Sequence, residues 1–111
     1  MGKQARLNAE RLALTKTLTL SGSERCLLRG IGIAPAPKSF NDVEAMGELF
    51  AILKISDAKI DDKPKAYALT VEKLKLLDRL IETTLQAGIW NGVGAMEALP
   101  VRNRVKEVEQ S

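Results

Sequence analysis

The sequence lacks histidine altogether and has a single cysteine among its 111 residues. Histidine is the side chain most often used as a general base and as a metal ligand near neutral pH, so its absence removes histidine-based triads and the commonest zinc sites. One cysteine can form neither an intrachain disulfide nor a thiolate zinc site. We therefore expect no metal, no cofactor and a protein that is not an enzyme.

Long apolar runs are also missing. No segment approaches the ~18 consecutive apolar residues of a membrane span, and the N-terminus has no apolar stretch of the kind found in signal peptides. A lone thiol without a disulfide framework is typical of a reducing compartment. These absences predict a cytoplasmic protein that does not enter membranes.

Aromatic residues make up only 4% of the chain, but hydrophobic residues as a whole make up 45%. That fraction suffices for one aliphatic core in a domain of this length. The mainly α fold that we expect is a compact bundle of four to five short helices, with room for a small two- or three-stranded sheet. The expected helices are 3–16, 22 to about 29, 43–54, 71–87 and 100–109, and the expected short strands are 17–20, 66–69 and 89–93.

Several helix ends carry local signals. Ser21 and Glu24 have the spacing of a capping box, and Thr70 and Gly88 are placed to begin and end the helix 71–87. Residues 94–99 are expected to form only a helical turn, because Pro100 fits the first turn of a last helix. On the outer side of helix 71–87 we expect two ion pairs within the helix, Lys75 with Asp78 and Arg79 with Glu82.

Charge is distributed unevenly along the chain. The formal net charge is +3, but residues 1–38 carry +5, residues 39–62 carry −4 and residues 63–111 carry +2. Such polarity suits head-to-tail self-association or an oriented partner as well as it suits nucleic acid. It also suggests two parts, a basic N-terminal helix or arm at 1–16 and a single globular helical domain at 17–111.

The basic N-terminal segment is the strongest candidate for partner binding. We expect Lys3, Arg6, Arg11 and Lys16 to spread around a helix and leave a positive surface for phosphate or for an acidic protein patch. The alternative is an ordinary solvated helix. The segment contains no aromatic residue, so stacking on single-stranded nucleic acid is unsupported.

Trp90 is the other candidate for partner binding. Tryptophan is enriched at binding hot spots, yet a single tryptophan in an aromatic-poor chain commonly fills the core. Cys26 stands beside two leucines and is expected in the core. Asp57, Asp61 and Asp62 lack the spacing of a calcium loop and are expected in a solvated loop.

Residues 18–28 contain a pattern that resembles other sequences. The residues Leu18-Thr19-Leu20-Ser21, Glu24-Arg25 and Leu27-Leu28 resemble the opening of small uncharacterised bacteriophage proteins. The two prolines at 35 and 37, the helices 43–54 and 71–87, and the region from Gly88 to Trp90 stand where those proteins have a proline loop, two helices and a glycine–tryptophan region. The resemblance implies a viral accessory protein and brings no known chemistry with it.

The resulting hypothesis is a small, non-enzymatic, phage-encoded accessory or regulatory protein that binds a host or viral protein. The same hypothesis allows self-association through the apolar part of residues 3–18 and the region around Trp90. A nucleic-acid-binding regulator of winged-helix-like type is the second hypothesis, and salt-sensitive binding of DNA or RNA would distinguish it from the first.

Overall fold

The computed structural model describes residues 9–32, 39–53 and 63–111. Residues 9–13 form a short helical segment. The elements that follow are β1 (Thr15–Leu20), α2 (Gly22–Leu28), the 3-10 helix η1 (Arg29–Gly32), α3 (Phe40–Leu53), β2 (Lys65–Thr70), α4 (Val71–Gln86) and α5 (Gly92–Gln110). The predicted mainly helical fold with a small sheet is confirmed.

The two strands form an antiparallel ribbon although they are far apart in the sequence. The pairs run from Thr15 opposite Thr70 to Leu20 opposite Lys65. A backbone bond from the Val71 N–H to the Leu14 carbonyl, 2.9 Å long, extends the pairing by one position. Each strand leads directly into a helix, so the order strand, helix, helix occurs twice in the described chain.

Both helices that follow the strands begin at a side-chain cap. The Ser21 hydroxyl accepts from the Glu24 N–H while the Glu24 carboxylate accepts from the Ser21 N–H, which confirms the predicted capping box. The Thr70 hydroxyl accepts in the same way from the Lys73 N–H. These caps fix the direction in which each chain leaves the ribbon.

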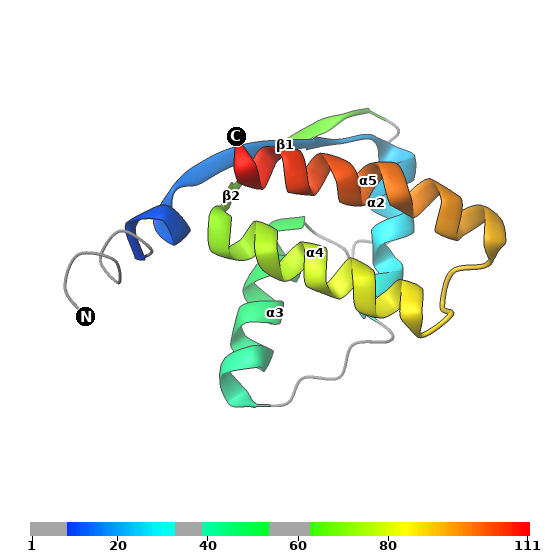
Figure 1. Ribbon diagram of the computed structural model, residues 1–111, viewed down its shortest axis with the longest axis horizontal. Helices are drawn as coiled ribbons and strands as arrows, with labels where there is room; N and C mark the ends of the chain where they lie inside the picture. Colours follow the sequence, from blue (N-terminus) through cyan, green and yellow to red (C-terminus); the bar gives the residue numbers. More distant parts are fainter. Residues whose placement is uncertain (1–8, 33–38, 54–62) are drawn as a thin grey trace.

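The centre of the molecule is the packing of α4 against α5. The helices lie side by side, β1 lies along α5, and α3 packs on α4 (Figure 1). The expected apolar stripe of α4 is buried between these elements. Its buried residues are Val71, Leu74, Leu77, Leu80 and Ile81, and they join Leu18, Leu20, Tyr67, Leu69, Val101 and Val105 in the core. Gly88, with φ +72°, follows the end of α4, as expected.

The structure corrects three expectations about elements. Lys16 lies in β1 rather than in an N-terminal helix, because the chain is already extended from Thr15. Residues 89–93 form no strand; Asn91 caps α5 instead. Pro100 lies inside α5 and does not begin a helix, so the expected turn at 94–99 is part of one long helix.

The two ion pairs expected within α4 are also replaced. Asp78 and Glu82 both pair with Arg102 of α5, at 2.9 and 3.3 Å, and Lys75 pairs with Glu109 of α5 at 3.8 Å. These ion pairs therefore connect α4 to α5 and do not form within one helix. The expected proline connector at 34–37 and the acidic residues Asp57, Asp61 and Asp62 lie outside the described residues. Among the described helices, none is long and apolar enough to cross a membrane.

Candidate protein-binding site

Helix α5 carries apolar side chains on two opposite faces, one along its middle and second half and one along its first half. Ala98, Val101 and Val105 are buried against the rest of the molecule. Val93, Met96 and Leu99 are 68%, 73% and 50% exposed. Residues three apart on a helix step by about 60°, so these three cover roughly a third of the circumference. They form a continuous apolar face, here called the α5 face, that no described element covers.

Trp90 fixes the start of α5 to α2. Its side chain is half-buried and packs against the core. Its indole N–H donates to the Leu27 carbonyl at 3.0 Å. A Cβ at Gly30 would lie 2.6 Å from the indole nitrogen, so only glycine allows the ring this position. Trp90 thus positions the α5 face, and the expectation of a core role describes it better than that of a free contact residue.

The backbone after Trp90 turns at once into the helix. The Asn91 side chain accepts from the Gly94 N–H at 2.8 Å. Ile89, which precedes the tryptophan, is 39% exposed. The turn 89–91 and its cap therefore hold the first turn of α5 in place next to α2.

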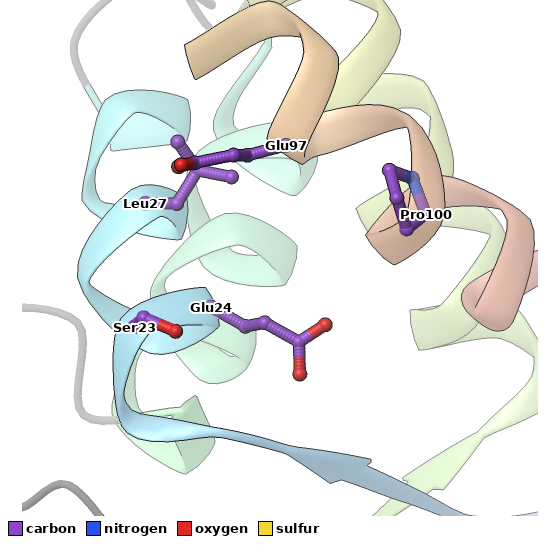
Figure 2. Close-up of a pocket in the computed structure, with 5 residues that line it drawn as sticks. All are labelled: Ser23, Glu24, Leu27, Glu97 and Pro100. Atoms are coloured by element: carbon purple, nitrogen blue, oxygen red, sulfur yellow. The ribbon is translucent and has the colours of Figure 1, made fainter. Parts of the chain in front are cut away.

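A hollow of about 300 Å³ lies between α2 and α5, beside the α5 face. Figure 2 shows Ser23, Glu24 and Leu27 along one wall and Glu97 and Pro100 on the other. Two of the five lining residues are carboxylates and none is basic. Arg104 pairs with Glu24, so the preference of the hollow for a cationic group comes from Glu97. Within the described part of the chain, Glu97 is in no salt bridge.

Glu24 is the better-held carboxylate of the two. Partial burial by itself raises the pKa of Glu24, but the Ser21 N–H and the Arg104 guanidinium hydrogen-bond to the charged form and bring the pKa below its ordinary value of 4.5. Arg104 lies 2.6 and 2.7 Å from the two carboxylate oxygens and also donates to the Thr19 carbonyl at 3.2 Å. Glu24 therefore remains charged at neutral pH and is committed to structure, whereas Glu97 is available to a partner.

The predicted basic residues do not gather at this site. Lys3 and Arg6 lie outside the described residues. Arg11 is exposed in the helical segment 9–13, and the Lys16 ammonium donates to the Ser111 carbonyl. Residues 9–13 lie at the end of the molecule opposite the start of α5 (Figure 1). Arg11 and Trp90 therefore belong to different surfaces.

The exposure of one side chain corrects a further expectation, and one surface was not expected. Cys26, expected in the core, is exposed, because the buried side of α2 is formed by Gly22, Arg25 and Leu28. The α5 face itself was missed in the sequence. Its signal was the spacing of Val93, Met96 and Leu99, which the expected break at Pro100 obscured.

A second hollow, of about 250 Å³, lies between α3 and α4. Its lining contains charges of both signs, including Glu48 and Lys73, whose side chains pair at 3.6 Å. Such a mixed, self-paired lining gives no preference for one ligand charge. Among the described residues no group of three or more cysteine, aspartate or glutamate side chains is placed to hold a metal ion.

Three comparisons of the chain with known proteins were negative. A scan of protein-family models, a search of curated proteins and a search of solved structures each find no match to the chain.

Proposed function

We propose that the chain is a small non-enzymatic accessory protein of the cytoplasm that acts by binding protein, and that the α5 face with its adjoining hollow is the binding site. The observation that carries the proposal is the exposure of Val93, Met96 and Leu99 on a helix whose other side is already in the core. The resemblance of residues 18–28 to bacteriophage proteins favours a viral source.

The energetic argument is simple. Burying a large aliphatic side chain contributes about 1.5–3 kcal/mol, and each of the three residues on the face still has half or more of its surface to bury. Contiguous apolar patches on a soluble protein commonly mark interaction sites. Glu97, at the edge of the face, adds a preference for a partner segment that carries basic as well as apolar side chains.

A second copy of this chain supplies such a segment. Leu14 is 52% exposed, and Arg11 is exposed one helical turn before it. This segment and the α5 face lie at opposite ends of a molecule 46 Å long (Figure 1). The segment of one chain therefore cannot reach the α5 face of the same chain. We therefore propose a head-to-tail contact in which residues 11–14 of one copy dock on the α5 face of the next.

Light scattering after size exclusion tests the site. The wild-type mass should rise with concentration, and Met96→Glu should stay monomeric because docking would bury a carboxylate in an apolar contact with Leu14 of the next copy, which is costly. Val43→Glu is the matched control: Val43 is 51% exposed on α3, away from the face, and its variant should associate like wild type. Equal association of Met96→Glu and wild type would contradict the site.

Mixing two variants tests the head-to-tail arrangement. The double variant Arg11→Glu with Leu14→Ser has a defective docking segment and an intact α5 face. Met96→Glu has an intact docking segment and a defective α5 face. Each should be monomeric alone, and their mixture should form a 1:1 complex because one intact contact remains. A wild-type protein that is monomeric at every concentration would contradict the second copy as partner, and a host or viral protein would then be the occupant to seek.

A further inference from the structure

We propose that the outer face of the β1–β2 ribbon binds the major groove of double-stranded DNA. This inference goes beyond the proposed function and concerns a different surface. It begins from the alternation of burial along the two strands. Leu18 and Leu20 are buried, while Thr15, Thr17 and Thr19, which alternate with the other residues of β1, are exposed.

The second strand alternates in the same way. Tyr67 and Leu69 are buried and Ala66 and Ala68 are exposed. The register places Thr17 opposite Ala68 and Thr19 opposite Ala66. The core side of the ribbon therefore carries Leu18, Leu20, Tyr67 and Leu69, with Lys16 half-buried and Lys65 exposed at its ends. The other side is a surface of hydroxyl and methyl groups with no large side chain.

Charge near this surface has one sign. Residues 11–20 and 63–70 contain Arg11, Lys16, Lys63 and Lys65 and no aspartate or glutamate. Arg11 and Lys65 are exposed near opposite ends of the ribbon: Lys65 forms the last pair with Leu20, on the core side of the ribbon but open to solvent, and Arg11 precedes Thr15. Cations so placed can reach phosphates on both sides of a groove while the small side chains between them approach the bases.

The dimensions and chemistry fit duplex DNA. A major groove about 12 Å wide admits a two-stranded ribbon, whose strands lie about 4.8 Å apart. Threonine hydroxyls can bond to base edges, and threonine and alanine methyl groups can contact the thymine methyl. The outer face has no aromatic residue on which an unpaired base could stack, and threonine is under-represented at protein–protein hot spots. These points favour a duplex over a single strand or a protein.

The ribbon is also held rigidly from behind. Its inner side chains are in the core with α4 and α5, and Arg104 of α5 donates to the Thr19 carbonyl at 3.2 Å. The exposed threonines are therefore presented on a fixed surface, so little order has to be created on binding.

Fluorescence anisotropy with a labelled duplex of about 20 base pairs at low salt tests the proposal, with the single strand of the same sequence as comparison. The full chain should bind the duplex more tightly than the single strand, and the affinity should fall steeply with salt. Thr17→Asp combined with Thr19→Asp should weaken duplex binding tenfold or more. Thr83→Asp, at an exposed threonine of α4, is the matched control and should leave it unchanged apart from a small charge effect.

A second pair of substitutions does not touch the strands. Arg11→Gln with Lys65→Gln should lower the slope of log affinity against log salt by about two, because two phosphate contacts are lost. Circular dichroism checks that each variant is folded. No duplex binding at low salt, tighter binding of the single strand, or a salt slope unaffected by Arg11→Gln with Lys65→Gln would overturn the proposal.

Discussion

Glu24 shows how much one side chain can hold together. Its carboxylate closes the capping box of α2 and also receives Arg104 from α5, whose guanidinium reaches the Thr19 carbonyl of β1. The adjacent elements β1 and α2 and the distant helix α5 therefore meet at one ion pair. The sequence indicates only the first of these roles, because the capping box is local and the partner on α5 is 80 positions away.

Substituting Glu24 should change the pH dependence of stability. The pKa of Glu24 is lowered in the folded state, so its contribution is present above the ordinary value of 4.5 and is lost as pH falls through the folded pKa. Glu24→Gln should lower the free energy of unfolding by about 1 kcal/mol at pH 7, with the difference from wild type shrinking as the pH falls below 4.5. Urea unfolding across this pH range measures it, and a difference independent of pH would contradict the charge-based account.

Gly30 should tolerate no side chain. In Gly30→Ala the new methyl group would lie 2.6 Å from the Trp90 indole nitrogen, so the ring must move and its bond to the Leu27 carbonyl must weaken. We expect a loss of about 1–3 kcal/mol and a shifted emission maximum from the only tryptophan of the chain. The control Gly47→Ala lies in α3 with no atom within 4 Å of the new methyl group, and it should be neutral or stabilising.

At the scale of elements, α5 combines two tasks with different requirements. Its second half packs on α4 and β1, whereas its first half presents the α5 face. Pro100 stands between them inside the helix. A proline there has no N–H to donate to the carbonyl four residues earlier, and its ring crowds that turn.

Replacing this proline should therefore stabilise the protein. Pro100→Ala restores a helical hydrogen bond, and a gain of about 2 kcal/mol remains after the looser unfolded chain is taken into account. Pro64→Ala is the control, since Pro64 lies outside any helix and its loss should lower stability slightly. Thermal unfolding measures both variants; a destabilised Pro100→Ala would mean that the helix depends on the proline.

The sequence predicted helices best where local signals and periodicity agree. The stripe of α4, its cap at Thr70 and the capping box at Ser21 were all readable. The start of α5 was misplaced because Pro100 is a common first-turn residue, while the cap at Asn91 competes with it. Lys16 was assigned to a helix because residues 3–16 contain good helix formers, but pairing with β2 overrides that propensity from Thr15 onward.

At the scale of the whole molecule, the proposed self-association uses the two opposite ends of an elongated molecule, and the proposed DNA contact uses one of its sides. Of the basic N-terminal segment, Arg11 takes part in both: it belongs to residues 11–14, the head of the self-association contact, and it also flanks the ribbon. Trp90, the other candidate, positions the α5 face through its hydrogen bond to the Leu27 carbonyl of α2. A single sequence predicted the types of residue involved, but which surface each occupies depends on strand pairing across the chain.

A shortened chain tests the head without touching the core. Removing residues 1–13 should leave the melting temperature nearly unchanged, because the described residues 9–13 are all exposed except Leu12, which is half-buried. The same chain should be monomeric, since Arg11 is lost. Light scattering and thermal unfolding together measure the two effects; a shortened chain that still self-associates would place the head elsewhere.

The pairing of β1 with β2 also has a consequence for how the chain folds. The paired residues are separated by 45 positions at Leu20 and Lys65 and by 55 at Thr15 and Thr70. Formation of the ribbon therefore closes a large loop, and the loss of chain entropy on closure precedes the favourable contacts of the paired strands. The adjacent helices α4 and α5 need no such closure, and we expect them to dock first. Leu18→Ala should therefore speed unfolding more than it slows refolding, whereas Leu77→Ala should do the reverse, as stopped-flow kinetics in denaturant can show.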